Sequence, residues 1–139
     1  MVRLLIASDH AGFVLKNKLM DYFKNKFEFT DFGTNSEESV DYPDFAHKLA
    51  NEISTKKLSG VLICGSGVGM SMVANRYNNV RAALCFNENM AKLSRQHNDA
   101  NIITLGARLI NKKLSLKLVE AFLMTKFEGG RHLKRVRKI

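Results

Sequence analysis

The sequence predicts an α/β fold: a three-layer αβα, Rossmann-like arrangement around a five-stranded parallel sheet. Short apolar segments rich in β-branched residues alternate with longer segments whose apolar residues recur every three or four positions. This alternation occurs five times along the chain. Strands that are joined by helices pair in parallel and need helices on both faces of the sheet, which gives the three layers.

The first part of the chain holds two strand–helix units. "VRLLIAS" at 2–8 is a continuous apolar run and predicts a buried strand. A helix is expected over 13–27, because apolar residues stand at 15, 19, 22 and 23. "FEFTDFG" at 27–33 alternates and predicts the second strand. A loop over 34–44 leads to a helix over 45–54, and Pro43 suits its first turn.

The second part continues the pattern. Strands are expected over 60–65, 80–86 and 101–107, and helices over 69–77, 87–97 and 111–127. The last helix has an apolar face that includes Leu114, Leu118 and Phe122, and Gly129-Gly130 ends it. Ligands of such sheets bind at the carboxyl ends of the strands, so the loops 8–12, 33–42, 64–70, 86–90 and 106–111 are the expected site.

We expect a single domain over 1–139, with a basic C-terminal tail from about 129. The 139 residues suit one hydrophobic core, and the chain has one proline and no low-complexity run that would mark a linker. No apolar run reaches the length of a membrane span or a signal peptide, so the cytoplasm is the expected location. Cys64 and Cys85 have neither zinc nor disulfide spacing and are expected to be free thiols, with Cys85 in the core.

The net charge of +9 is compatible with nucleic acid, an acidic membrane or a small anion as a partner. Five of the 22 Lys and Arg residues lie within "RHLKRVRKI" at 131–139, which is either a solvated end or an anion clamp. Arg131 and Arg135 are four residues apart and share one face if the tail is helical. The alternative function of another class is a binding module, either for nucleotides through the glycine loop at 65–69 or for nucleic acid through the basic charge. Against nucleic acid, the chain has no basic strand interleaved with aromatic residues and no zinc finger.

The segment "VLICGSGVGM" at 61–70 joins a strand to a glycine loop and a helix. Its G-x-G-x-G spacing, after the third strand, fits neither the dinucleotide fingerprint nor a Walker loop. Backbone amides at 66–70 are expected to point toward Cys64, favouring its thiolate and stabilising a developing oxyanion. This arrangement suits nucleophilic attack on a carbonyl or proton abstraction beside one, and His10 and His97 are possible partners.

Six motifs in the same order resemble ribose-5-phosphate isomerase B and its relatives, the galactose-6-phosphate and allose-6-phosphate isomerases. They are "SDHAG" (8–12), "DYPD" (41–44), "CGSGVGMS" (64–71), "ANR" (74–76), "LSRQHNDAN" (93–101) and "EGGRH" (128–132). The likeness runs from Leu5 to about Arg135. It implies metal-free aldose–ketose isomerisation of a sugar phosphate through a cis-enediolate, with no cofactor, and ribose 5-phosphate is the first expected substrate. Hexose 6-phosphates are the alternative.

The resemblance also implies residue roles. Cys64 is the expected base, Ser66 the group that moves a proton between O1 and O2, and His97 the acid or base that opens the sugar ring. The expected substrate-binding residues are Asp9, His10, Tyr42, Gly65, Gly67, Val68, Gly69, Met70, Asn98, Arg108, Arg131 and Arg135. Of these, His10 and the three arginines resemble phosphate ligands, and the amides of 65–70 resemble an anion hole.

The comparison with this family also shows two residue differences and implies an oligomeric state. Some family members have glutamate in the position of Met70 and lack the cysteine, so this chain resembles the cysteine-base subgroup. Ser66 stands where the family often has threonine and keeps the hydroxyl. The family forms homodimers, sometimes paired further, whose sites borrow residues from the neighbouring chain, and we expect the same here. Asp9 and His97 have a simpler interpretation as helix caps.

Overall fold

The structure is a computed structural model that describes residues 1–139. Its centre is a five-stranded sheet in the order β2–β1–β3–β5–β4, and each pair of neighbouring strands is parallel. The strands are β1 (Val2–Ser8), β2 (Phe27–Asp31), β3 (Ser59–Cys64), β4 (Ala82–Leu84) and β5 (Ile102–Gly106). The α/β fold with a five-stranded parallel sheet is therefore confirmed.

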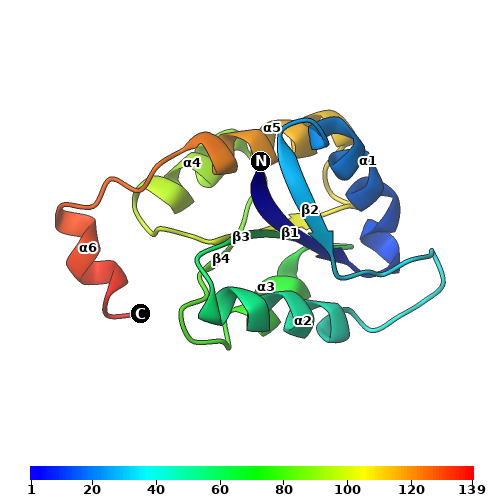
Figure 1. Cartoon of the computed structure of the whole chain (residues 1–139), viewed down its shortest axis with the longest axis horizontal. Coiled ribbons are helices and arrows are strands. Elements are labelled where there is room, and N and C mark those ends of the chain that lie inside the picture. Colours follow the sequence, from blue (N-terminus) through cyan, green and yellow to red (C-terminus); the bar gives the residue numbers. More distant parts are fainter.

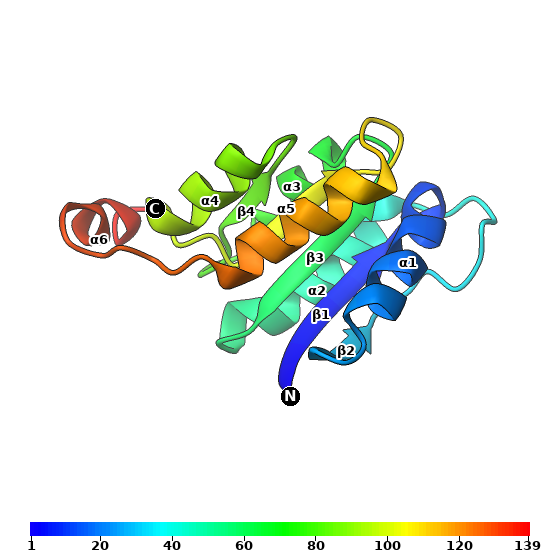
Figure 2. The same cartoon turned by 90° about the horizontal axis from the view of Figure 1, so that it is seen from above.

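Helices cover both faces of the sheet. They are η1 (His10–Gly12, a 3-10 turn), α1 (Phe13–Phe23), α2 (Tyr42–Thr55), α3 (Val68–Ala74), α4 (Glu88–Gln96), α5 (Lys112–Met124) and α6 (Arg131–Val136). Helices α1, α4 and α5 lie on one face, and α2 and α3 lie on the other (Figure 1). Helix α6 stands apart, beyond the C-terminal ends of α4 and α5, in both views (Figures 1 and 2). None of the helices combines the length and apolar character that crossing a membrane requires.

Each helical layer buries its own hydrophobic core against the sheet. One core joins α1, α4 and α5 to the strands and includes Leu19, Phe23 and Phe122, and the other lies under α2 and α3. Burying one such side chain stabilises the fold by about 1.5–3 kcal/mol. Cys85 is in the first core, as expected, whereas Tyr22 of the expected apolar face is exposed.

Several element boundaries differ from the sequence-based prediction, and three of the differences have a clear structural reason. Helix α2 begins at Tyr42, three residues early, because Asp41 takes the extended N-cap conformation and proline fits the first turn. Strand β4 is limited to Ala82–Leu84, because it is an edge strand that pairs only with β5. Helix α1 ends at Phe23 because the chain must turn before β2 begins at Phe27.

A buried lysine fixes the chain where β2 ends. Lys16 of α1 is 1% exposed, and its Nζ lies 2.7 Å from both carboxylate oxygens of Asp31 and 2.7 Å from the Thr34 carbonyl oxygen. The same loop is bonded to the end of β1, since the amide of Ser8 donates to the Gly33 carbonyl and the amide of Thr34 to the Ser8 carbonyl. Lys16 therefore anchors the loop that borders the carboxyl ends of the strands.

Candidate active site

A pocket of about 560 Å³, which we call the cysteine pocket, opens where β1 and β3 end. It is lined by Asp9, Tyr42, Cys64, Gly65, Ser66, Val68, Gly69, Met72, Arg108 and Leu109. These residues come from the loops after β1, β3 and β5 and from the starts of α2 and α3. The pocket thus lies at the strand ends where the topology predicts a ligand site.

Cys64 is the last residue of β3 and is 4% exposed. The backbone amide of Gly67 donates a hydrogen bond to its Sγ at 3.1 Å. A donor held on sulfur by the backbone stabilises the charged form of a thiol more than the neutral form. The geometry therefore suits a cysteine that exchanges a proton with a molecule in the pocket.

The loop after Cys64 presents unpaired backbone donors. The amides of Gly65, Ser66, Gly69 and Met70 donate no hydrogen bond within the chain, and the amide of Val68 donates only to Ser66 Oγ, at 3.2 Å. Unpaired amides are costly away from water, and several from consecutive residues form a concave anion-binding surface. This surface can hold an oxyanion that develops next to the cysteine.

Two glycines give the loop its shape. Gly67 has a φ of +79°, and a Cβ on it would lie 2.6 Å from Leu84 Cδ1. A Cβ on Gly69 would lie 2.6 Å from the ring of Tyr42, so the aromatic ring packs directly on the backbone of α3. Tyr42, the first residue of α2, thereby forms one wall of the pocket.

Asp9 and Arg108 supply opposite charges to the pocket. Asp9 is 6% exposed, and its Oδ1 accepts from the amide of Gly12, so it caps η1 as the simpler interpretation held. Its Oδ2 has no partner in the chain and can accept from a ligand hydroxyl. Arg108 lies over Gly65, whose amide oxygen accepts from the Arg108 backbone, and its guanidinium makes no ion pair.

A second group of predicted residues lies at the ends of α4 and α6, in a pocket of about 470 Å³ that we call the histidine pocket. It is lined by His97, Asn98, Arg131, His132, Arg135, Val136 and Ile139. The rings of His97 and His132 stack, with centroids 4.3 Å apart and planes 16° from parallel. Burial lowers the pKa of His132, and the nearby charges of His97 and Arg131 lower it further, against the carboxylate of Glu128.

The two pockets have no lining residue in common. His97 follows α4, at the end of the molecule that carries α6, whereas Cys64 lies where β3 ends (Figures 1 and 2). His10 lines neither pocket, and its Nδ1 accepts from the amide of Val40 at 3.1 Å. One chain therefore holds the predicted base and the predicted ring-opening histidine in separate places.

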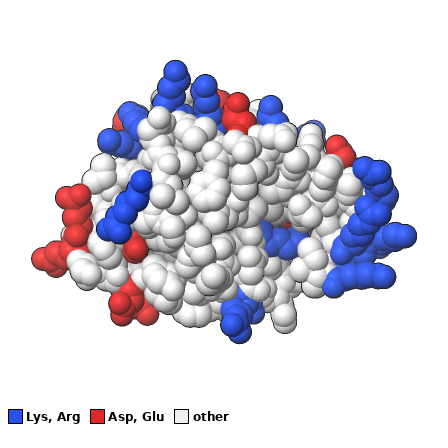
Figure 3. Space-filling view, turned by 180° about the vertical axis from the view of Figure 1, so that it is seen from behind, with Lys and Arg blue, Asp and Glu red and all other residues white.

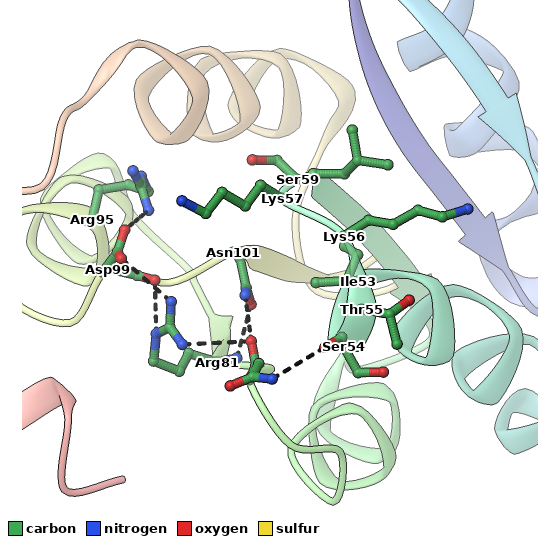
Figure 4. Close-up of a pocket in the computed structure, with 12 residues that line it drawn as sticks. Ile53, Ser54, Thr55, Lys56, Lys57, Ser59, Arg81, Arg95, Asp99 and Asn101 are labelled. Carbon is green, nitrogen blue, oxygen red and sulfur yellow. Dashed lines mark hydrogen bonds and ion pairs between the residues drawn. The ribbon is translucent and has the colours of Figure 1, made fainter.

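A third pocket, of about 560 Å³, lies near the end of α2 (Figure 4). Its two arginines turn toward the same carboxylate: Arg81 Nη2 lies 3.3 Å from Asp99 Oδ2, and Arg95 Nη1 lies 2.9 Å from Asp99 Oδ1. None of the predicted site residues lines it. The arginines are thus engaged in holding the chain before β5, and this pocket is not the candidate active site.

The charge is unevenly distributed over the surface. Figure 3 shows Lys and Arg side chains gathered at the end that carries α6, with others along the upper edge, and Asp and Glu side chains mostly toward the opposite end. Arg131 and Arg135 belong to both the basic end and the histidine pocket. The excess charge is therefore concentrated next to a pocket, as an anion clamp requires.

The chain resembles known proteins in both sequence and structure. The profile of a family described as Ribose/Galactose Isomerase matches residues 4–139. The chain belongs to the ribose/galactose isomerase family. Ribose-5-phosphate isomerase B of Escherichia coli is 39% identical over 141 residues, which cover 100% of this chain and 95% of that protein. The resemblance inferred from the motifs is confirmed.

Two solved structures extend the comparison. A ribose 5-phosphate isomerase from Thermotoga maritima has a TM-score of 0.95 and 52% identity, over 99% of this chain and 96% of that one. Ribose-5-phosphate isomerase B from Mycoplasma genitalium, solved with bound ribulose-5-phosphate, has a TM-score of 0.94 and 41% identity, over 99% and 94% of the two chains. The whole of this family member therefore shares their fold.

The structure brings most predicted residues to a pocket and adds three that were missed. Met70 is fully buried in the core, so only its backbone can serve a ligand. Met72 and Leu109 line the cysteine pocket, and no pattern distinguishes them from ordinary surface residues. His132 was missed, although it closes the "EGGRH" motif, one position after an arginine that was predicted.

Proposed function

We propose that this chain is a metal-independent aldose–ketose isomerase that interconverts ribose 5-phosphate and ribulose 5-phosphate. Family membership supports this proposal, as does the relative from Escherichia coli whose name is ribose-5-phosphate isomerase B. The observation that carries it is the position of Cys64, whose Sγ accepts from the Gly67 amide in a pocket bordered by unpaired amides. A base beside an oxyanion-binding surface is what is needed to move a proton between a carbonyl carbon and the carbon next to it.

In the proposed reaction, Cys64 is the base. With the sugar ring open and the aldehyde at C1, the thiolate takes the proton from C2, and the electron pair of that bond forms the C1–C2 double bond of a cis-enediolate. The negative charge then rests on O1, where the amides of Gly65, Ser66, Gly69 and Met70 are available as donors. After the hydroxyl proton has moved from O2 to O1, the thiol returns its proton to C1, and the charge on O2 forms the C2 carbonyl of the ketose, which regenerates the thiolate.

Other residues are proposed to transfer the hydroxyl proton, to bind the sugar hydroxyls and to open the ring. Ser66 Oγ lines the cysteine pocket and, as both donor and acceptor, is suited to moving the proton between O2 and O1. The free Oδ2 of Asp9 is suited to holding a sugar hydroxyl, and the ring of Tyr42 limits the space beside it. His97, as acid or base with Asn98 as hydroxyl partner, is proposed to open the furanose ring.

The phosphate needs positive charge and hydrogen-bond donors, and we propose that Arg108, Arg131 and Arg135 supply the charge and that His10 supplies a donor. Val40 donates its amide to His10 Nδ1, so the neutral ring carries its proton on Nε2 and can donate there. Arg131 and Arg135 are exposed residues of α6 and make no ion pair in the chain. Arginine forks bind phosphate oxygens in pairs, which fixes the sugar over the base.

We further propose that the active enzyme is a homodimer, with the option of pairing dimers, in which the histidine pocket of one copy completes the cysteine pocket of its partner. The separation of the two pockets within one chain supports this arrangement. Large apolar side chains are exposed around both: Met72 and Leu109 at the first, and Leu93 and Leu133 near the second. Apolar residues that rim a site in this way are typical of subunit interfaces.

The two cysteines are free thiols, which fits the reducing cytoplasm that we propose as the location. Apart from the second copy of the chain, the proposed reaction needs only the sugar phosphate, and no nucleic acid or membrane is required. The basic residues that suggested nucleic acid gather beside the histidine pocket, where a phosphate ligand accounts for them.

The test is an isomerisation assay in excess EDTA with ribose 5-phosphate and allose 6-phosphate offered separately. We expect turnover of the pentose phosphate, its loss in Cys64→Ala, and its retention in Cys85→Ala, which removes the other thiol from the core. Turnover of the hexose phosphate alone would move the substrate class and keep the site. Activity that survives in Cys64→Ala would remove this residue as the base.

A further inference from the structure

We propose that His97, Glu128 and His132 form a binding site for a divalent transition-metal ion, best suited to Zn²⁺, and that the bound ion inhibits the enzyme. The inhibition rests on the proposed function, because it follows from the role given to His97. The binding site itself rests only on the geometry of three side chains.

The three side chains are held together by the backbone. The amide of Glu128 donates to the Gln96 carbonyl at 3.1 Å, which ties the segment before α6 to the end of α4. His97 is the C-cap residue of α4, and His132 lies in the first turn of α6, four residues after Glu128. This tie places the Glu128 carboxylate beside the Nε2 atoms of both imidazoles.

The distances approach those of a coordination shell. Glu128 Oε1 lies 3.6 Å from His132 Nε2 and 3.9 Å from His97 Nε2, and one ligand atom from each of the three residues lies within 4.8 Å of the others. Ligand atoms around tetrahedral zinc are about 3.3 Å apart. The widest pair must therefore close by about 1.5 Å, and the two stacked imidazoles must tilt toward each other so that both lone pairs point at one ion. His97 and Glu128 are 39% and 50% exposed and are free to make this movement, whereas His132 is held.

The donor set selects the metal. Two imidazoles and one carboxylate, with open positions for water, are ligands that bind Zn²⁺ and similar ions. His132 Nε2 is an acceptor in the structure, since the Nε–H of Arg131 donates to it at 3.5 Å, so this nitrogen has a lone pair that a metal could take in place of Arg131. Arg131 and Arg135 repel cations, and Arg131 must turn away for the metal to bind. Mg²⁺ and Ca²⁺, which prefer oxygen ligands, are therefore not expected to bind.

A metal in this cluster would occupy the lone pair that His97 needs as an acid or base, and would hold its ring away from the sugar. The isomerisation itself requires no metal in the proposed mechanism. Zn²⁺ is therefore expected to act as a reversible inhibitor that competes with substrate and is removed by EDTA.

Binding is tested first, without reference to activity. Isothermal titration with Zn²⁺, and the visible absorption of Co²⁺, are measured on the full-length Cys64→Ala protein, because the thiolate is a competing ligand. We expect one ion per chain, and a loss of affinity of at least about 10-fold in His97→Ala, Glu128→Gln and His132→Ala, on the same background. His47→Gln is the matched control: this histidine is bonded to Tyr77 elsewhere, and its loss should leave the affinity unchanged.

Two binding results would overturn the site. One is that Zn²⁺ does not bind Cys64→Ala at all, which would assign any binding by the wild type to the thiolate. The other is that Glu128→Gln and His132→Ala, both checked for folding by circular dichroism, keep the affinity of the parent protein.

Inhibition is tested second, in the isomerase assay with wild type and Glu128→Gln. We expect Zn²⁺ to inhibit the wild type and Glu128→Gln to need at least about 10-fold more. Equal sensitivity of the two proteins would overturn the inhibitory role. If the protein isomerises neither sugar, the proposed function fails, but the titration still decides the metal site.

Discussion

The backbone amide of Gly67 lies 3.1 Å from Cys64 Sγ and donates a hydrogen bond to it. Because this donor is fixed by the turn, it needs no rearrangement to meet the negative charge that the proposed base must carry. Cys64→Ser keeps an acceptor in the same place, but a serine hydroxyl is not ionised near neutral pH. We expect kcat to fall by about 10²–10⁴-fold, the range of a lost general base. The check is exchange of the C2 hydrogen with deuterated solvent, which should slow in parallel, and unchanged exchange would contradict the assignment.

Tyr42 packs on Gly69 so closely that a methyl group cannot be added between them. Gly69→Ala should therefore push the ring from the pocket wall and lower kcat/KM by about 10-fold or more, since small misplacements at a reaction centre are costly. The control is a double-mutant cycle with Tyr42→Ala. If the ring is the cause, adding Gly69→Ala to Tyr42→Ala should cost little more, whereas two additive losses would place the damage in the loop itself.

The proposed division of the site between two copies predicts complementation. Cys64→Ala and His97→Ala should each be inactive as homodimers, because every site lacks one of the two groups. When the two variants are unfolded together and refolded, half of the dimers are mixed, and one of their two sites is intact. We expect about a quarter of wild-type activity in the mixture. Activity no greater than that of the separate variants would show that each chain uses its own His97.

Lys16 and Asp31 form a bidentate ion pair whose lysine is buried and whose carboxylate is 30% exposed. Removing one partner leaves the other charge unpaired, so Asp31→Ala should lower the free energy of unfolding by about 3 kcal/mol. Lys16→Met together with Asp31→Ala should cost less than Asp31→Ala alone. Urea unfolding measures both, and a larger cost in the double variant would contradict an electrostatic cause.

Burial raises the pKa of the Cys85 thiol from 9.0 to about 11, against a hydrogen bond with Ser94 that lowers it. The unfolded chain therefore loses this proton at a lower pH than the folded chain. Stability supplied by the neutral thiol is complete below about pH 9 and falls as the pH rises toward about 11. Urea unfolding at about pH 8 and about pH 10 should show a smaller decrease for Cys85→Ala than for the wild type. Equal decreases would mean that other groups account for the alkaline loss.

The fold was predictable because strands and helices leave separate periodic signals, and because parallel strands place their connecting loops at one edge. Cys64, Ser66 and the glycines could be placed from their position directly after β3, and Asp9 from its position directly after β1. The length of the edge strand could not be predicted: the whole of 80–86 has a strand-like sequence, but only Ala82–Leu84 pairs with β5.

The separation of Cys64 and His97 into two pockets of one chain could not be predicted from one sequence. Cys64 ends β3 and His97 caps α4, and nothing in their spacing in the sequence tells whether these two element ends meet. The structure separates them because α4 runs away from the carboxyl ends of the strands and places His97 beside α6 (Figure 2). Met72 and Leu109 could not be found at all, because a single exposed apolar residue is ordinary at a protein surface.

Helix α6 stands off the body of the fold and holds the two arginines and His132 (Figure 1). In the proposed dimer, a lone chain would hold all the required groups and yet have no complete site. Dissociation would then stop catalysis without unfolding any element, so specific activity should decline on dilution through the dissociation constant of the dimer. A newly made chain would likewise be inactive until it forms a dimer with a second one.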